Sequence, residues 1–508
     1  MISEQNTNDI DHDPTLPTWV RVCVLLLMFV AHFAGTWLPL LGPDEPRYSQ
    51  VAKEMFERGD WVTPTLGGFN WFEKPALLYW LQNISYHLFG VNEFSARFGS
   101  VIFGLAIAAF LSVLIKRTLG GTTLATAAWM MSGSALGLLA FAHGASFDIV
   151  VTFPITASLV CFWLAESKGR GGTRMYATSF AFMGLGLLAK GLIGIVFPLA
   201  VIAGYFVLAW RRPTAEFLRS VLWGIPLALA VASAWYLPMY LRHGWAFIDE
   251  FIIQHHFQRF TSNKYQHPQP FIFFFWVLPL MTLPWLPLCL SGLYSTLKRF
   301  VRSISSEVPE EDRPLPFELF LLVWIAVPLL FFSFSGSKLP GYILPSVPPA
   351  VLLGVLGLKR AASKRAWLFK FIPSLAAGIF VIAIVMSITV MRGIAAADSV
   401  KGLIEAVDAR GYSNARVVGL HTVSHNAEFY ASGRLVRDLD GRQRRFLGTA
   451  EIFEYIDLND HRPVIVLVPV EYERELIDTD KFTFQKIAEN GDLIAAVASP
   501  VSFGGSAP

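Results

Sequence analysis

Charge is scarce in this sequence. Lys, Arg, Asp and Glu make up only 16% of its 508 residues, whereas a soluble protein carries about 25%. Apolar residues reach 54% and are bunched in runs of about 20, the length that a helix needs to cross a bilayer. The sequence therefore predicts an α-helical polytopic membrane protein. Its formal net charge of +3 is too small to indicate a nucleic-acid partner.

Cysteine is also rare. Cys23, Cys161 and Cys289 all lie inside apolar runs, so they form neither a disulfide framework nor a metal-ligand motif. The chain has no internal repeat of the kind that marks many transporters. Its first apolar stretch, over residues 19–41, lacks a small-residue cleavage site, and we expect it to be retained as a spanning helix.

The remaining apolar runs predict eleven spans and their orientation. The candidate spans begin near residues 18, 94, 122, 147, 176, 192, 218, 271, 317, 342 and 367. Every second connection is rich in Lys and Arg if the N-terminus is cytoplasmic, as the positive-inside rule requires. This orientation predicts a cytoplasmic tail over residues 1–17 and a multi-span domain over residues 18–395. Three longer loops, over residues 42–93, 241–269 and 335–341, then lie on the outer side.

The composition changes from about Ala397 onward. Short strand-like runs (ARVVGL, PVIVLVP and LIAAVA) alternate with polar, helix-compatible segments such as TAEIFEYI and EYERELI. This alternation is typical of a small α/β domain. We expect such a domain over residues 396–508, on the outer side of the membrane.

The first outer loop opens with GPDEPRYSQVAKEMFERGDWVTP, residues 42–64. Tyr48, Val51, Ala52 and Met55 recur at helical spacing, and Gly59 marks the end of the predicted helix. The segment is too short and too charged to span a bilayer. We expect it to lie along the membrane surface.

Ionisable side chains gather in the outer loops, each close to an apolar helix. Such residues are costly near the bilayer and are usually functional. Lys and Arg are suited to binding a phosphate, and a carboxylate can orient or deprotonate an incoming hydroxyl. The pattern predicts a site for a substrate with a lipid tail and an anionic head. The candidates are Asp44, Glu45, Arg47, Tyr48, Glu73, Lys74, His143, Asp148, Lys190, His255, His256, Arg259, Lys264, His267, Lys338 and Tyr342.

The loop motifs resemble those of a known family. DE-x-R-Y, FEKP, GLLAKG, QHHFQRF and SKLPGYILP occur in that order along the chain. Together they resemble the bacterial lipid-linked-sugar glycosyltransferases of the GT-C superfamily. These are the aminoarabinose transferases that modify lipid A and relatives of the protein O-mannosyltransferases. The resemblance covers nearly the whole chain, including the C-terminal domain.

The resemblance implies a function. The family takes a sugar from a polyprenyl-phosphate donor and transfers it, with inversion at the anomeric carbon, at the outer face of the inner membrane. Lipid A or another envelope component is the implied acceptor. Asp44 is then the leading catalytic carboxylate, with Asp148 as a second acidic residue of the site. Lys74, Arg259 and Tyr342 are the implied ligands of the donor phosphate. The further substrate-binding candidates are Glu45, Arg47, Tyr48, Lys190 and Lys338.

The resemblance also implies a metal ion. Some members hold their loops together with zinc, and here Glu73, His256 and His267 are the implied ligands of zinc or another divalent cation. The HH pair leaves the choice between His255 and His256 open. The alternative is that these histidines are ordinary hydrogen-bonded loop residues.

Other candidates also have structural alternatives. Asp44, Glu45 and Asp148 can cap helix N-termini. Lys74 can extend its charged end to the membrane surface, and Lys190 and Lys338 can be interfacial anchors.

Two alternative functions remain. A protein or envelope-glycan O-glycosyltransferase would share the donor site and differ in its acceptor cleft. A transporter of lipid-linked sugars would carry out no chemistry. Against the transporter, the charges lie in the outer loops rather than at the middle of the bilayer, where transporter sites lie.

Overall fold

The computed structural model describes residues 17–168, 172–258, 269–304 and 313–501, with backbone alone at residues 168, 252 and 255–258. The chain forms two compact units. The helical unit comprises Met1–Ala34, Phe72–Leu78 and Arg97–Ile384, and the α/β unit comprises Gly35–Trp71, Tyr79–Ala96 and Val385–Pro508.

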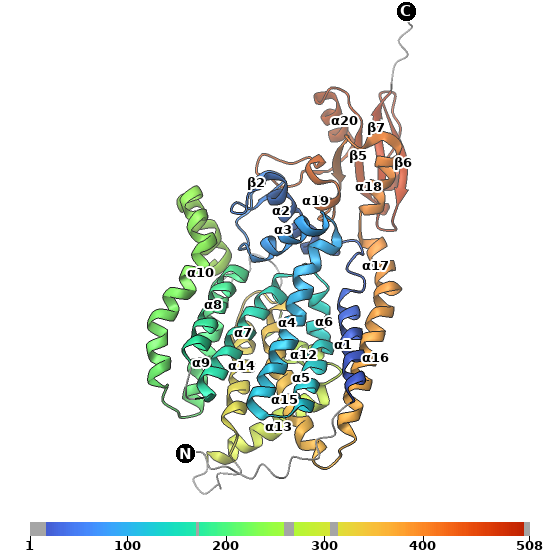
Figure 1. Ribbon diagram of the computed structural model, residues 1–508. Helices are drawn as coiled ribbons and strands as arrows, with labels where there is room; N and C mark the ends of the chain where they lie inside the picture. The colour runs from blue at the N-terminus through green and yellow to red at the C-terminus, as the bar shows by residue number, and fades with distance from the viewer. Residues whose placement is uncertain (1–16, 169–171, 259–268, 305–312, 502–508) are drawn as a thin grey trace, which may run out of the picture. The chain divides into compact units, whose positions relative to one another are not determined.

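Long apolar helices make up the helical unit (Figure 1). Helix α4 begins and helix α16 ends in the α/β unit. The elements are α1 (Thr18–Phe33), α4 (Glu93–Leu119), α5 (Thr122–Ser134), α6 (Leu136–Ala142), α7 (Phe147–Lys168), α8 (Thr173–Lys190), α9 (Ile193–Leu208), α10 (Ala215–Phe247), the π-helix η2 (Ile248–Gln258), α12 (Phe273–Met281), α13 (Leu286–Ser303), α14 (Pro316–Ser333), the 3₁₀-helix η4 (Pro340–Ser346), α15 (Val347–Ala362) and α16 (Leu368–Ile388).

Each of the eleven predicted spans corresponds to a helix of this series, so the helical, polytopic class is confirmed. Within the described residues, six helices are long and apolar enough to cross a membrane, and up to eight spans result if each bent pair counts as one. The pair α5 and α6 bends by 58°, and the pair α12 and α13 bends by 120°. Helices α1 and α9 are apolar but shorter, with 16 residues each.

Small residues allow two of these helices to pack backbone to backbone. A Cβ atom at Gly292 of α13 would overlap the carbonyl oxygen of Leu353 in α15, and one at Gly357 would lie 2.5 Å from the carbonyl oxygen of Leu288. Glycine is common at such contacts in membrane proteins because it lets two backbones approach closely. The contact fixes α15, which η4 directly precedes.

A buried ion triad ties together three helix ends in the helical unit. Glu318, near the start of α14, is fully buried, and its carboxylate accepts hydrogen bonds from Arg299 of α13 and Arg360 of α15. It also accepts the backbone N–H of Leu315. Because η4 connects the far end of α14 to the start of α15, the triad and η4 lie at opposite ends of these helices.

The α/β unit contains the C-terminal sheet and most of the first predicted outer loop. Its elements are α2 (Asp44–Arg58), β1 (Thr65–Leu66), β2 (Phe69–Asn70), most of α3 (Leu77–Phe89), α17 (Val390–Asp398), α18 (Lys401–Val407), η5 (Asp408–Tyr412), β3 (Arg416–Leu420), α19 (Ala427–Tyr430), η6 (Ser432–Arg434), β4 (Arg445–Phe446), α20 (Thr449–Leu458), β5 (Val464–Pro469), η7 (Val470–Glu475), β6 (Phe482–Glu489) and β7 (Leu493–Pro500).

The C-terminal sheet has the strand order β4-β3-β5-β7-β6. Strand β3 runs parallel to β4 and β5, whereas β7 runs antiparallel to β5 and β6. Helix α20 covers one face of the sheet and α18 the other (Figure 1). Because β5 is buried on both faces, it reads as the continuous apolar run VIVLVP. The predicted α/β domain is thus confirmed, and its three predicted strands are β3, β5 and β7.

Helix α2 forms in the first predicted outer loop. Its apolar stripe of Tyr48, Val51, Ala52 and Met55 is buried inside the protein, and the helix contacts α19 and β1. The apolar stripe is therefore accounted for by packing inside the protein, and the position of this helix along the membrane surface stays a prediction. The stripe packs against protein, because another part of the α/β unit supplies the apolar partner.

Candidate active site

Three predicted site residues meet in the helical unit. Asp148 lies in the first turn of α7, Lys190 is the last residue of α8, and Tyr342 belongs to η4. The Lys190 ammonium donates to Oδ1 of Asp148 and lies 4.8 Å from the centroid of the Tyr342 ring. The side chains of Asp148 and Lys190 are mostly buried. We refer to these three residues as the Asp148 cluster.

The local backbone explains why the Asp148 carboxylate faces Lys190. Ser146 accepts the backbone N–H of Asp148 at 3.1 Å, so the Ser146 hydroxyl takes over the capping role considered for Asp148. Gly341, next to Tyr342, leaves room for the carboxylate, since a Cβ atom there would overlap Oδ2 of Asp148. The cluster therefore combines a carboxylate, an ammonium and a phenol on three separate elements.

Lys338 has a different environment. It is only 6% exposed, and its ammonium donates to the carbonyl oxygens of Ser335 at 2.7 Å and Gln269 at 2.9 Å. These bonds tie the turn before η4 to residue 269. The side chain thus holds the backbone next to Tyr342.

Lys74 and Glu73 form an ion pair in the helical unit. The Lys74 ammonium lies 2.9 Å from Oε1 of Glu73, and both side chains are largely buried. The neighbouring Phe72 ring packs against His243 at 4.9 Å and Phe247 at 5.7 Å between centroids. The predicted phosphate ligand Lys74 is therefore paired with a carboxylate, and the residue before that carboxylate, Phe72, packs among aromatic rings.

The predicted metal site cannot be assembled from the described residues. Arg259 and His267 lie outside them, and His256 is described by its backbone alone. The described part of the chain contains no group of three His, Cys, Asp or Glu side chains that could hold a metal ion. Because the side chains of His256 and His267 are not among those described, zinc binding by Glu73, His256 and His267 stays a prediction.

The residues predicted around Asp44 lie in the α/β unit. Arg47 donates to Oδ1 of Asp44 at 2.5 Å and to the carbonyl oxygen of Pro43 at 2.9 Å. The Asp44 side chain is 52% exposed. Glu45 accepts the backbone N–H of Leu41 at 2.9 Å. Glu45 therefore bonds the backbone just before α2, whereas the Asp44 carboxylate pairs with Arg47.

A histidine that the sequence did not single out lies near this pair. Burial lowers the pKa of His425, and the positive charge of Arg47 lowers it further, whereas Glu428 and Asp44 act in the opposite direction. The neutral imidazole is therefore favoured beside the Asp44–Arg47 pair. His425 lies in the C-terminal domain, which carried no motif that linked it to the first loop.

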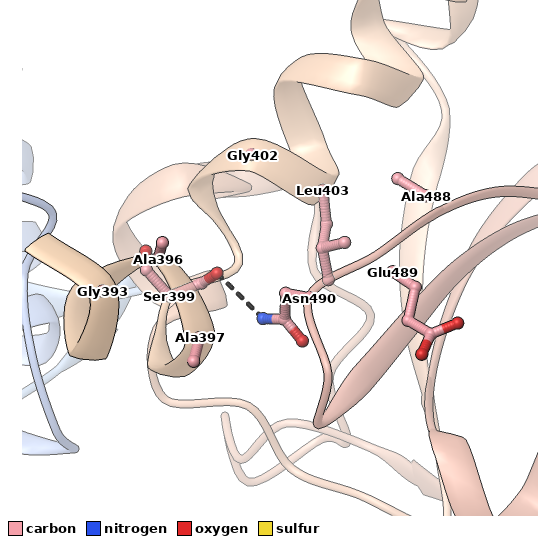
Figure 2. Close-up of a pocket in the computed structure, with 9 residues that line it drawn as sticks. All are labelled: Gly393, Ala396, Ala397, Ser399, Gly402, Leu403, Ala488, Glu489 and Asn490. Atoms are coloured by element: carbon pink, nitrogen blue, oxygen red, sulfur yellow. Dashed lines mark hydrogen bonds between the residues drawn. The ribbon is translucent and has the colours of Figure 1, made fainter.

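The α/β unit also has an open hollow of about 480 Å³ between α17, α18 and the turn after β6 (Figure 2). Asn490 donates to the carbonyl oxygen of Ser399 at 3.0 Å, and Glu489 points away from that bond. Small and apolar residues supply most of the remaining lining, and none of the nine lining residues is Lys or Arg. The hollow therefore lacks the cations expected of a phosphate site.

Comparison with known proteins identifies related sequences. Residues 73–237 match the model of the dolichyl-phosphate-mannose-protein mannosyltransferase family. The undecaprenyl phosphate-alpha-4-amino-4-deoxy-L-arabinose arabinosyl transferase of Pseudomonas aeruginosa is 32% identical over 345 residues, covering 66% of this chain and 59% of that protein. The protein of the same name from Aeromonas hydrophila is 32% identical over 384 residues, covering 70% and 63%. The chain thus spans about three fifths of the length of these relatives.

Solved structures share the fold. The crystal structure of ArnT from Cupriavidus metallidurans bound to undecaprenyl phosphate matches with a TM-score of 0.75 at 20% identity, covering 96% of this chain and 99% of that chain. The archaeal oligosaccharyltransferase AglB from Archaeoglobus fulgidus matches with a TM-score of 0.52 at 15% identity, covering 90% and 70%. The chain therefore has the GT-C fold of ArnT and is an ArnT-like relative of the undecaprenyl-phosphate aminoarabinose transferases, as its loop motifs predicted.

Proposed function

We propose that the protein is an integral-membrane glycosyltransferase that uses an undecaprenyl-phosphate-linked sugar as donor. The sugar is 4-amino-4-deoxy-L-arabinose or a related sugar, and the acceptor is lipid A. One observation carries the donor class: about two thirds of this chain is 32% identical to proteins named for that donor. The alternation of basic connections supports transfer at the periplasmic face of the inner membrane, with the C-terminal domain in the periplasm.

The Asp148 cluster has the chemistry to bind the donor phosphate. Lys190 brings a positive charge, and its bond to Asp148 and its place over the Tyr342 ring restrict its position. A fixed cation stabilises the phosphate most strongly as its negative charge grows on departure, and preorganised electrostatics of this kind is usually the largest catalytic contribution. We assign Lys190 and Tyr342 to phosphate binding and Asp148 to holding Lys190.

The proposed reaction exchanges one bond at the anomeric carbon. The bond to the phosphate oxygen breaks, and its electron pair leaves with undecaprenyl phosphate. An acceptor oxygen forms the new bond from the opposite face, which inverts the anomeric configuration. An alcohol acceptor must also lose its proton to a base, and Asp44 is the proposed base. A lipid A phosphate is already anionic, so Asp44 then only positions the acceptor.

Mass spectrometry of lipid A tests this function. A bacterial strain that lacks the gene is complemented with the wild-type gene or an empty vector, and both lipid A fractions are compared. We expect a mass increase equal to one sugar residue only in the strain with the wild-type gene. Identical lipid A in both strains, with the donor lipid present, would exclude lipid A as the acceptor.

The family model supports a second candidate acceptor. Residues 73–237 match a family named for mannosyl transfer to protein, so a protein O-glycosyltransferase is the alternative. The same pair of strains separates the two functions. Unchanged lipid A together with a hexose-sized loss from envelope glycoproteins in the empty-vector strain would favour the protein acceptor.

Gly341→Ala tests the Asp148 cluster. The added methyl group overlaps Oδ2 of Asp148 and must displace it from Lys190. Since a misplacement of about 1 Å lowers rates by about 10²-fold, we expect a loss of transfer rate of that order in purified protein. Gly378→Ala in α16 is the matched control, because a Cβ atom there meets open space. An unchanged rate for Gly341→Ala would contradict the role of this cluster.

A further inference from the structure

The backbone directly before Asp44 is held by two residues of the C-terminal part of the chain. The Tyr430 hydroxyl accepts the backbone N–H of Leu40 at 2.8 Å, and Oδ2 of Asp398 accepts the backbone N–H of Gly42 at 2.9 Å. These bonds fall four and two residues before Asp44. They fix the turn from which α2 starts.

Both anchoring side chains are themselves held by charged or polar partners. The Tyr430 hydroxyl lies 3.1 Å from Oε1 of Glu93 and can donate to it, while the Lys401 ammonium donates to the same oxygen at 2.8 Å. The Asn426 amide donates to Oδ2 of Asp398 at 3.4 Å and to its backbone carbonyl oxygen at 3.3 Å. The bonds to Leu40 and Gly42 are therefore parts of a connected network, in which each member restricts the next.

Helix α2 is attached to the same domain farther along its length. Gln50 and Lys53 both donate to the Ser432 hydroxyl at 3.3 Å. The Lys53 ammonium also lies 5.5 Å from the centroid of the Phe429 ring. These contacts oppose rotation of α2 about its own axis, which would move the Asp44 carboxylate.

The hairpin that follows α2 adds another attachment. Glu54 of α2 accepts the backbone N–H of Gly67 at 2.6 Å, at the tip between β1 and β2. A Cβ atom at Gly67 would overlap the Arg437 guanidinium, and one at Gly441 would lie 2.5 Å from the Phe69 ring. The start of α2 and the hairpin bonded to Glu54 are thus both held against the C-terminal domain.

We propose that the C-terminal domain is a working part of the active site, with Tyr430 and Asp398 as positioning residues that set the place of the Asp44 carboxylate. The proposal rests on the proposed function, because it assigns the catalytic step to Asp44. It gives the domain a catalytic purpose that neither the loop motifs nor the names of the relatives assign to it.

Tyr430→Phe is the first variant, because it removes one hydroxyl and keeps the ring. We expect kcat to fall about tenfold or more, since small misplacements of a reacting group are costly. The Kd for undecaprenyl phosphate and the Tm of the detergent-purified protein should stay unchanged, which separates positioning from loss of fold. Tyr412→Phe, at a tyrosine that packs against a core of the same domain, should keep the wild-type kcat.

Asp398 allows a conservative rescue. Asp398→Ala removes the acceptor of the Gly42 N–H, whereas Asp398→Asn keeps an oxygen at the same place. We expect a loss of kcat for alanine and recovery of most of it for asparagine. Equal losses for both variants would overturn the positioning role of this side chain.

A double-mutant cycle distinguishes failure of this proposal from failure of the proposed function. If Tyr430 acts through Asp44, Tyr430→Phe should lower the residual rate of Asp44→Asn no further, because effects of coupled residues do not add. Full additivity, or a wild-type kcat for Tyr430→Phe, overturns the positioning proposal alone. A wild-type rate for Asp44→Asn overturns the catalytic assignment, and a loss with Tyr430→Phe in that case shows that the domain acts by another route.

Discussion

Asp44→Asn is expected to lower kcat for sugar transfer by about 10²-fold or more, because lost positioning of a reactant costs about 10²-fold and a lost general base about 10²–10⁴-fold. The substitution keeps the size of the side chain and removes its negative charge and basicity. The carboxylate is 52% exposed and carries Arg47 at 2.5 Å, so it is accessible to an acceptor. Donor binding should be retained, and the Kd for undecaprenyl phosphate measures it independently of turnover.

Glu57→Gln is the matched control for this substitution. It changes another exposed carboxylate of α2, which is 53% exposed and lies 4.0 Å from the Lys53 ammonium, to an amide. We expect its kcat to stay within about twofold of wild type, because an exposed ion pair contributes at most about 1 kcal/mol to stability. Equal losses for Asp44→Asn and Glu57→Gln would indicate damage to α2 rather than loss of a carboxylate at the site.

The comparison of wild type with Asp44→Asn also tests the transporter alternative. A transporter binds the lipid-linked sugar and moves it without breaking the anomeric bond. Purified wild-type protein would then release no undecaprenyl phosphate from the donor, whatever the acceptor supplied. Release by wild type but not by Asp44→Asn would exclude that alternative, because it requires cleavage at the anomeric carbon.

The sequence predicted the helices well because their signal is local. A run of apolar residues long enough to cross a bilayer needs no partner to be recognised, and α7 begins at Phe147, as predicted. The strand β5 was equally clear, since its burial on both faces leaves a continuous apolar run. Strand β6 was missed because half of its residues are exposed and half of its sequence, FTFQKIAE, is polar.

The candidate site was predicted as a set of residues but not as contacts. Asp148 and Lys190 are 42 positions apart, and they meet only because α7 and α8 pack side by side (Figure 1). Before that pairing was known, capping and membrane anchoring explained each residue equally well. The backbone partners of Lys338 and the capping role of Ser146 likewise require atomic positions.

The partner that covers the apolar stripe of α2 could not be predicted for the same reason. An apolar stripe on a short helix reports that the stripe is buried, but not whether lipid or protein covers it. Here, α19 and β1 lie against α2, and α19 is encoded nearly 400 residues later. The spacing of residues along the chain does not show that α2 and α19 are in contact. The connection between Asp44 and the C-terminal domain was therefore not predicted.

Glu318→Ala is expected to cause the largest loss of stability, about 3–5 kcal/mol in the free energy of unfolding, as found when one partner of a buried ion pair is removed. Glu318 is fully buried, and its carboxylate faces both Arg299 and Arg360. Without it, the Arg299 and Arg360 guanidinium groups lose the buried carboxylate that they share. Thermal unfolding in detergent, followed by loss of monodisperse protein, measures the effect as a drop in Tm.

Glu216→Ala in α10 is the control, because this partly exposed carboxylate accepts the Thr173 hydroxyl at 3.0 Å, and loss of such a bond costs about 1 kcal/mol. If the loss at Glu318 arises from unpaired charge, adding Arg360→Met to Glu318→Ala should restore part of the stability. No restoration would instead attribute the loss to the cavity and the broken bond to Leu315.

The triad lies at the end of α14 and α15 opposite η4, so the folded fraction of Glu318→Ala should retain the wild-type Kd for undecaprenyl phosphate. A weakened Kd in that fraction would mean that the triad also sets the position of Tyr342, through the length of α15.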